Sequence, residues 1–434
     1  MRGLEDSSRA ARTLRRALFR TSSADLNASA AASSRTLRSM FTALLLAWPC
    51  LLAAQPMALE DILASSRDRL GPVIDNPEQH RLQIMVTYIE LGEDGVPKLH
   101  RDHYRSDPNE YFYPASVVKF PIAVAALEWI EDTGNRSIDQ HTTMLTEASR
   151  PSQTEVLEDP TAADGRPTIA HYIRKLSIVS DNDASNRLFE LIGQDELQRR
   201  MQRWGMTASR ITHRLAIRLP AKENRHSNAV RFVDADGTLL HRRPAREGGN
   251  LAAGIEPILL GVGEVVDNEY VDNPKDFSGL NHMPLAEVHQ LLEAIIVPEG
   301  AAAERIPRMS ESGRKLLLEA MRVMPSESGI DAYQDAERYP DGFANYFIMG
   351  RNPDRLPEGV TIINKVGRAY GFLTETAYIE DATGDVAFIL SATLEVNANG
   401  VYNDNEYEYA ELGFPFLAEL GMLVLEQARM RSRR

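Results

Sequence analysis

Apolar side chains recur at helical spacing near the start of the chain and at strand spacing soon after it. Residues 58–75 carry apolar positions on one helical face, which predicts a helix, and residues 82–91 are rich in β-branched residues, which predicts a strand. An acidic turn at Gly95 separates that strand from residues 98–105, so the two segments predict a β-hairpin. Residues 116–131 then predict an apolar helix.

The middle of the chain is predicted to be mainly helical, and strands return near its end. Residues 169–200 give helical patterns that break near Ser180 and near Gly193. Further predicted elements are amphipathic helices at 284–297 and 312–324, a long closing helix at 406–431, a hairpin at 228–243, and strands at 361–370, 374–381 and 386–395. Strands therefore lie toward both ends of the chain, with helices between them.

This order predicts an α/β (α+β) fold in which an antiparallel sheet, built from both chain termini and flanked by helices, carries an inserted all-helical lobe. The sheet-and-helix lobe is expected to comprise residues 58–130 and 340–431, and the helical lobe residues 131–339. Within the helical lobe, residues 215–280 are rich in Gly, Asn and Pro and are predicted to form a loop and hairpin insertion.

The N-terminal segment differs from the rest of the chain in charge. Residues 1–54 hold eight Arg and three acidic residues, and Arg35 and Arg38 precede a short apolar run that ends in small residues. The run is shorter than the ~20 residues of a membrane-spanning helix, so the pattern predicts a secretory signal peptide, with a buried helix as the alternative. Residues 1–39 have no apolar face, which makes Met40 an alternative start and 1–39 an over-called extension. We expect a periplasmic or secreted bacterial protein.

Composition restricts the class of partner. The 434 residues are 25% charged and 43% hydrophobic, as in folded globular proteins. The formal net charge of −14 disfavours nucleic acid and anionic membranes, because phosphates would be repelled. The single Cys, Cys50, lies inside the predicted leader, so the rest of the chain has no disulfide. We expect no nucleic-acid partner, and no membrane partner after the leader is removed.

Ser116 and Lys119 stand three residues apart at the start of the predicted apolar helix, so their side chains share a face. A hydroxyl is a poor nucleophile until a base takes its proton, and a buried Lys that stays neutral can be that base. The pattern is weak alone. A second such pair, Ser312 and Lys315, lies in a polar setting, where Ser312 is predicted to be a helix cap or a solvated first-turn residue.

Two more short motifs follow. The Ser-Asp-Asn run from Ser180 to Asn182 is, by itself, typical of a helix cap or turn. The Lys-Val-Gly run from Lys365 lies in a predicted strand, where a single Lys is usually solvated. With the pair at Ser116, the motifs fall in order on a helix, a loop of the helical lobe and a strand. That set approximates the one found in class A β-lactamases and penicillin-binding proteins.

Over about residues 75–430, the chain resembles the class A β-lactamase-like serine hydrolases of the penicillin-recognising superfamily. Residues 180–193 are similar to the family's segment, including the helix that follows the motif. The resemblance implies the β-lactamase-like fold, an acyl-enzyme mechanism, and a small-molecule substrate such as a β-lactam, a peptide or an ester.

The resemblance also implies roles for the residues of the first two motifs. Ser116 matches the acylated nucleophile, and Lys119 matches its base or proton relay. Ser180 matches the group that hands a proton to the leaving nitrogen. Asn182 matches a side chain that orients the substrate and Lys119.

The strand motif supplies the remaining matches. Lys365 matches the cation near Ser180 and the acidic group of the substrate. Gly367 matches the position where the strand backbone approaches the substrate closely. The backbone N–H groups of Ser116 and Arg368 match an oxyanion hole, in which each donor is worth ~3–4 kcal/mol.

Three features depart from the family pattern. After Arg214, the positions where the family carries a water-activating Glu hold Leu215 and Ala216, and the next Glu is Glu223. Without that carboxylate the acyl-enzyme is expected to be long-lived. Val366 stands where the family usually has a hydroxyl, a loss of ~1–3 kcal/mol for a buried polar contact. The extra residues between the second and third motifs fall mostly within 215–280 and are expected to reshape the rim of the active site.

Other chemistry-bearing patterns are weaker. The sequence has no P-loop, dinucleotide-binding or HExxH motif, so we expect no cofactor and no metal. His100 and His103 fall on opposite faces of a predicted strand without a third ligand, which favours an exposed or satisfied position. An acidic run over 403–408 lacks EF-hand spacing and is expected to be solvated.

Three functions remain open from the sequence. The first is an exported serine hydrolase that acts on β-lactam-type amides through an acyl-enzyme at Ser116. The second is a DD-peptidase or esterase of the same superfamily, which the missing Glu and Val366 favour. The third is a catalytically silent protein that binds ligands in an inherited cleft.

Overall fold

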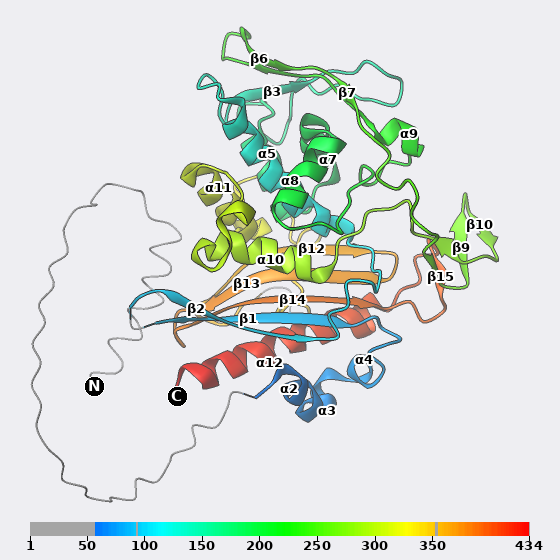
Figure 1. Ribbon diagram of the computed structural model, residues 1–434, viewed down its shortest axis with the longest axis vertical. Coiled ribbons are helices and arrows are strands. Elements are labelled where there is room, and N and C mark those ends of the chain that lie inside the picture. The colour runs from blue at the N-terminus through cyan, green and yellow to red at the C-terminus, as the bar shows by residue number, and fades with distance from the viewer. Residues whose placement is uncertain (1–56, 93, 352–354, 434) are drawn as a thin grey trace, which may run out of the picture.

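A five-stranded antiparallel sheet forms the centre of the protein (Figure 1). The computed structural model describes residues 57–92, 94–351 and 355–433, so the predicted leader at 1–54 lies outside the described residues. The strand order is β12-β13-β14-β1-β2, which places strands from near both chain ends side by side. The predicted fold class, a mixed α/β fold with an antiparallel sheet built from both termini, is confirmed.

The sheet strands follow the predicted segments closely. Every residue of β13 is buried, as expected for an inner strand covered on both faces, whereas exposed residues recur along the edge strand β2. The strands are β1 (Gln83–Leu91), β2 (Pro97–Tyr104), β12 (Val360–Ala369), β13 (Phe372–Asp381) and β14 (Val386–Glu395). Gln83 of β1 pairs with Thr393 of β14, and this pairing joins the two parts of the sheet.

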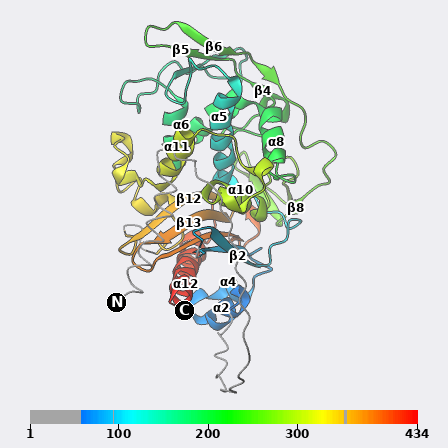
Figure 2. The ribbon, with the colours of Figure 1, turned by 60° about the vertical axis from the view of Figure 1, so that its left-hand side comes forward.

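Helices cover both faces of the sheet (Figure 2). One face carries α5 (Lys119–Thr133), α10 (Leu285–Ile296) and α11 (Glu311–Arg322), and the other carries the long α12 (Phe414–Ser432). A separate hydrophobic cluster fills each interface. The predicted helix at 58–75 is three short helices, α2 (Leu59–Ser65), α3 (Arg67–Leu70) and α4 (Pro72–Asp75). The first break falls at Ser66 and the second at Gly71, which has φ 66°.

The helical lobe contains α6 (Ile169–Ile178), α7 (Asn182–Ile192) and α8 (Gln194–Arg203), with breaks where the sequence predicts them. The carboxylate of Asp181 caps α7 by accepting a hydrogen bond from the backbone N–H of Ala184. Gly193, at φ 82°, ends this helix. The division of the chain into lobes at 130/131 and 339/340 stays a prediction.

Short elements surround the helical lobe. The predicted hairpin at 228–243 is confirmed as β5 and β6, and the sequence did not predict β3, which pairs with β5. These elements are β3 (Thr143–Thr146), α9 (Ala221–Asn224), β4 (His226–Ser227), β5 (Val230–Val233), β6 (Leu239–Arg243), β7 (Arg246–Glu247), β8 (Leu259–Leu260), β9 (Gly263–Val266), β10 (Glu269–Val271), β11 (Lys275–Asp276) and β15 (Val401–Tyr402). Within the described ranges, no helix has the length and hydropathy needed to cross a bilayer.

Candidate active site

The turn that carries Ser116 has an unusual backbone. Ser116 lies in a 3-10 turn, Ala115–Val118, that leads directly into α5. Ala115, just before it, has φ 46°, a left-handed conformation that residues other than Gly rarely adopt. Such strain is held only where the surroundings enforce it, and it is common at functional sites. The turn leaves Ser116 half-buried at the N-terminal end of an apolar helix.

Lys119 is fully buried, and its amine is surrounded by oxygens. Its Nζ lies 2.8 Å from the Oγ of Ser116, 3.1 Å from the Oγ and 2.5 Å from the carbonyl oxygen of Ser180, and 2.7 Å from the Oδ1 of Asn182. A neutral amine can donate its two N–H groups to the carbonyl oxygens of Ser180 and Asn182, and its lone pair can then accept the proton of the Ser116 hydroxyl.

The electrostatic environment favours that neutral amine. Burial, reinforced by the nearby charge of Lys365, lowers the pKa of Lys119 well below its usual value. Ser180 lies between the two lysines, since the Nζ of Lys365 also donates to its Oγ at 3.0 Å. Ser180 is held in the left-handed region at φ 54°, immediately before α7. A chain of proton donors and acceptors therefore links Ser116, Lys119, Ser180 and Lys365.

Lys365 reaches this chain from strand β12. Its side chain is buried, and its Nζ donates to the carbonyl oxygen of Val366 at 2.9 Å as well as to Ser180. Burial lowers the pKa of Lys365 to about 7, and the negative charge of Glu375 partly opposes this shift. Lys365 can therefore change its charge close to neutral pH.

Glu375 is a buried carboxylate near Lys365 that sequence reasoning missed. It accepts hydrogen bonds from the backbone N–H groups of Tyr346, at 2.9 Å, and Phe347, at 2.6 Å, and from the side chain of Asn364. Burial raises its pKa to about 7 in spite of these bonds. The only signal in the sequence is a Glu in a strand that also carries Thr and other acidic residues, and such a residue could equally have faced solvent.

Gly367 is required where β12 meets the nucleophile turn. A Cβ at this position would lie 2.3 Å from the carbonyl oxygen of Pro114 and 3.2 Å from the backbone nitrogen of Ser116. Only Gly allows the strand to approach this closely. The guanidinium of the exposed Arg368 lies over the rings of Tyr409 and Phe414. Its predicted role, donation of a backbone N–H to an oxyanion, stays a prediction.

The structure gathers the five predicted side chains, Ser116, Lys119, Ser180, Asn182 and Lys365, from three separate parts of the chain. The two lysines are buried, both Ser side chains are half-buried, and Asn182 is exposed. Solvent therefore reaches the site from its hydroxyl side. This arrangement suits a hydroxyl that attacks an incoming carbonyl while a buried amine takes its proton.

Val366 occupies a different environment from the one expected for a substrate contact. Its side chain is 3% exposed and belongs to the hydrophobic cluster that includes Leu373 and Phe416. The apolar residue at this position therefore packs the core on the α12 side of the sheet. A hydroxyl at position 366 would be buried in that apolar core, whereas the side chain of Val366 packs there without an unsatisfied polar group.

The loop after Arg214 provides no carboxylate for the nucleophile. Leu215 is buried, and Arg214 forms a buried ion pair with Glu190 at 2.7 Å. The first Glu beyond it, Glu223, is bound instead to Arg150 at 2.8 Å. Among the hydrogen bonds within the described ranges, none joins a carboxylate to Ser116 or Lys119.

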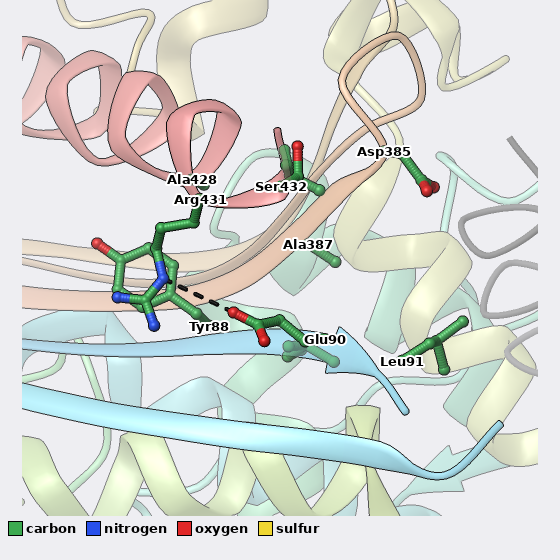
Figure 3. Close-up of a pocket in the computed structure, with 10 residues that line it drawn as sticks. Tyr88, Glu90, Leu91, Asp385, Ala387, Ala428, Arg431 and Ser432 are labelled. Carbon is green, nitrogen blue, oxygen red and sulfur yellow. Dashed lines mark ion pairs between the residues drawn. The ribbon is translucent and has the colours of Figure 1, made fainter. Parts of the chain in front are cut away.

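Two of the cavities in the described part of the chain lie far from each other in the fold. The larger, about 740 Å³, is lined by Tyr113, Tyr370 and the loops around Arg214 and the insertion. The smaller, about 270 Å³, lies where β1, β14 and the end of α12 meet (Figure 3). There Arg431 covers the ring of Tyr88, with its Nε 3.8 Å from Glu90. Neither lining includes any of the five predicted side chains of the candidate site.

The two histidines on β2 do not form part of a site. His100 and His103 are exposed, and the Nε2 of His100 lies 3.2 Å from Glu90. Over the residues that the structure describes, no group of three His, Cys, Asp or Glu side chains is placed to hold a metal ion.

Comparison with known proteins gives one family match. Residues 78–240 match the model of the Beta-lactamase enzyme family. Similar solved structures include a beta-lactamase from Desulfarculus baarsii (17% identity, 83% of this chain, 97% of that chain, TM-score 0.46), one from Xanthomonas campestris (18%, 85%, 99%, 0.44), and PBP-A (16%, 85%, 98%, 0.46). No curated protein matches the sequence. The matched segment, which is less than half of the chain, contains Ser116, Lys119 and the Ser180–Asn182 run, so this part of the chain is similar to the Beta-lactamase enzyme family.

Proposed function

We propose that the protein is an exported hydrolase that forms an acyl-enzyme at Ser116 and acts on an amide of the β-lactam type. One observation carries the proposal: the buried amine of Lys119 lies 2.8 Å from the Oγ of Ser116. The lowered pKa of Lys119 supports its role as a base at neutral pH. Its connection through Ser180 to Lys365 provides a route for the proton to the leaving group.

In the proposed acylation, the Oγ of Ser116 bonds to the substrate's carbonyl carbon while its proton passes to the Nζ of Lys119. The negative charge that develops on the carbonyl oxygen is stabilised by the backbone N–H groups of Ser116 and Arg368. The carbon–nitrogen bond then breaks, and the leaving nitrogen receives a proton from Ser180, which regains one from Lys119. The positive charge of Lys365 stabilises the Ser180 oxygen while Ser180 gives up its proton. The same charge attracts an acidic group of the substrate.

Deacylation is proposed to be slow. It requires a base that activates water, and Leu215 and Ala216 stand at the positions where the family's Glu is expected. A general base contributes a factor of about 10²–10⁴ to such a step, so its loss lengthens the life of the acyl-enzyme. The buried Leu215 therefore also favours a second candidate, a DD-peptidase or esterase, in which the acyl group passes from Ser116 to another acceptor or is released slowly.

We propose a periplasmic or secreted location. The support is the basic segment, short apolar run and small residues of the predicted leader at 1–54. Expression of the full chain with N-terminal sequencing of the mature form tests this. Cleavage near residue 54 and recovery outside the cytoplasm are expected, and an uncut chain in the cytoplasm contradicts the proposal.

Labelling with a fluorescent penicillin and with a fluorophosphonate, followed by intact-mass measurement, tests the nucleophile. The wild-type chain is expected to gain the mass of one acyl or phosphonyl group, and Ser116→Ala is expected to gain none. Ser312→Ala, in the exposed Ser–Lys pair, is the matched control and should be labelled normally. A wild-type chain that never gains mass contradicts the proposal and favours a silent binding protein. Turnover of nitrocefin against esters and D-Ala-D-Ala peptides then separates the two enzymatic candidates.

A further inference from the structure

A row of buried polar side chains crosses the face of the central sheet that α10 covers (Figure 1). Thr87, Thr376 and Ser391 are fully buried, and His289 of α10 is 2% exposed. In the register of the sheet, Thr376 lies directly opposite Lys365, and Ser391 lies directly opposite Thr376. Directly opposed residues point to the same face of a sheet. The row therefore begins beside the lysine of the candidate site and runs away from it.

Four hydrogen bonds join these side chains into one buried hydrogen-bond chain. The Oγ1 of Thr376 lies 2.8 Å from the Oγ of Ser391, and that Oγ lies 2.8 Å from the Nδ1 of His289. The Nε2 of His289 lies 2.9 Å from the Oγ1 of Thr87, whose hydroxyl donates to Glu293 at 3.0 Å. Buried polar groups are costly unless they are paired, and each of these has a partner. The chain thus leads from strand β13 to a carboxylate of α10.

The carboxylate of Glu293 fixes the direction of the bonds. It pairs with Arg101 of β2 at 2.6 Å, and a carboxylate accepts hydrogen bonds but donates none. Thr87 therefore gives its one proton to Glu293 and accepts a hydrogen bond from the Nε2–H of His289. Burial lowers the pKa of His289 to about 4, so the ring is neutral near neutral pH and carries a single N–H. Its Nδ1 is left as an acceptor.

The same rule sets the bonds nearer the candidate site. Ser391 gives its one proton to the Nδ1 of His289, so its oxygen accepts the proton of Thr376. Every proton in the chain therefore points away from Lys365, and the oxygen lone pairs of Thr376 form the near end. The Cβ atoms of directly opposed residues lie about 4.5–5.5 Å apart. Because aligned hydrogen bonds polarise one another, the partial negative end of the chain lies beside Lys365 and favours its charged form.

Other groups also act on the charge of Lys365. Glu375 of β13 favours it and Lys119 of α5 opposes it, while burial lowers the pKa of Lys365 to about 7. Asp181, just before α7, acts on Lys119 in turn. α11 also packs against β12, and none of the charged side chains on that described helix is buried. Lys365 is thus close to balance at neutral pH, where a change in the local field alters its charge.

We propose that His289 is a positioning residue of the candidate site. By orienting the hydroxyls of Ser391 and Thr376, it helps Lys365 to keep its positive charge. That charge stabilises Ser180 during acylation, so the proposal rests on the acyl-enzyme function proposed above.

A titration of Lys365 in the free protein tests the proposal directly. Lysine labelled with a carbon isotope at Cε gives one NMR signal for each of the seven lysines, and the signal that is lost in Lys365→Met belongs to Lys365. In the wild type its midpoint is expected at a pH of about 7. His289→Leu, which breaks the chain at its centre, should lower the midpoint by at least about 0.5 pH units.

Matched variants make the readout specific. His289→Gln keeps a donor and an acceptor and should hold the midpoint close to that of the wild type. His103→Leu makes the leucine change at an exposed histidine of the same sheet and should leave the midpoint in place. Ser391→Ala removes the next link and should act like His289→Leu. Thermal unfolding checks each fold, and if one of the two chain-breaking variants does not fold, the other decides.

Acylation of Ser116 by an acetyl thiolester, followed by mass spectrometry across the same pH range, connects the chain to function. The fall of the second-order rate constant at alkaline pH should begin at a lower pH in His289→Leu, by the same amount as the titration. Adding Lys365→Arg should abolish this difference, because Arg stays charged.

The outcomes separate the two proposals. A midpoint that stays in place in both His289→Leu and Ser391→Ala, or that falls equally in His289→Gln or His103→Leu, overturns the positioning role and leaves the acyl-enzyme intact. No acylation at any pH overturns the acyl-enzyme function, while the titration still decides whether His289 sets the charge of Lys365.

Discussion

The side chain of Asn186 binds both polar groups of the Leu215 backbone. The N–H of Leu215 donates to Oδ1 at 2.9 Å, and Nδ2 donates to the carbonyl oxygen of Leu215 at 3.0 Å. Asn186 lies on α7 one turn after Asn182, so the loop is fastened to the helix that begins at the candidate site. The backbone of this loop is therefore fixed at position 215, and the side chain there is the aliphatic Leu215.

Replacing Leu215 with Glu is expected to speed release of the acyl group. The variant places a carboxylate on a backbone that Asn186 already fixes, and a general base typically contributes about 10²–10⁴-fold. Part of that gain, at least about tenfold, should appear as faster loss of the acyl mass from Ser116. Leu215→Gln is the control, because it matches Glu in size without its charge. Equal acyl-enzyme lifetimes for the two variants contradict the prediction.

Replacing Gly367 with Ala is expected to slow acylation about 10²-fold or more. The new Cβ cannot occupy a position 2.3 Å from the carbonyl oxygen of Pro114, so the strand must move away from the Ser116 turn. Misplacement of about 1 Å can cost this much. Gly279→Ala is the matched control, because its Cβ would meet nothing within 4 Å. The rate is measured by mass spectrometry as acylation of Ser116 by a small thiolester, an acetyl thiolester, and near-normal acylation of Gly367→Ala contradicts the prediction.

The sequence predicts the strands and the main helices of the candidate site because each depends on local patterns. The three-residue spacing of Ser116 and Lys119 on an apolar helix determines their contact almost directly. The breaks around α7 follow from turn-forming residues, including Gly193. Motif order then indicates that Lys365 belongs with them, although it is distant in the sequence.

The remaining features depend on tertiary contacts that no local pattern encodes. The left-handed backbone at Ala115 and Ser180 is imposed by packing, since neither residue favours it. The position of Glu375 depends on the pairing of β12 with β13, which sets Val366 opposite Glu375. The cavity depends on Asn281 and other long-range contacts that join the insertion to the loop.

Replacing Lys365 with Arg is expected to change the pH profile of acylation. Acylation should rise with pH as Lys119 loses its proton and fall as Lys365 loses its charge, because burial lowers the pKa of Lys365 to about 7. The two lysines titrate as a coupled pair, so the rising and falling limbs of the pH profile reflect both lysines together and neither one alone. Arg stays charged to high pH, so the alkaline limb should move above about pH 9. The second-order rate constant for acylation of Ser116 by an acetyl thiolester, measured across about pH 5–10, checks this.

The exposed Lys315 provides the control for that profile. Lys315→Arg makes the same change at a side chain that is 47% exposed, and it should leave both limbs in place. An alkaline limb that stays near pH 7 in Lys365→Arg would show that another group causes it.

Replacing Lys365 with Met is expected to stabilise the fold while removing activity. The lysine has an ordinary pKa of about 10.4 when unfolded, and burial lowers its pKa to about 7 when folded. Between these values the unfolded state binds more protons, so the stability of the wild type rises with pH. The cost of burying the lysine is thus fully present below about pH 7 and fades toward about pH 10. Met should raise the free energy of unfolding by about 1–2 kcal/mol near pH 6.

The gain from Lys365→Met should shrink as the pH approaches about 10, because the folded lysine is then neutral and the cost of burying its charge is largely gone. Chemical denaturation near pH 6 and near pH 10 measures both values, with Lys315→Met as the exposed control that should change neither. A Met variant that is less stable near pH 6, or a gain that grows with pH, contradicts the prediction. The expected pattern would mean that the buried amine of Lys365 lowers the stability of the fold. Such a cost fits a residue whose amine donates a hydrogen bond to Ser180 in the candidate site.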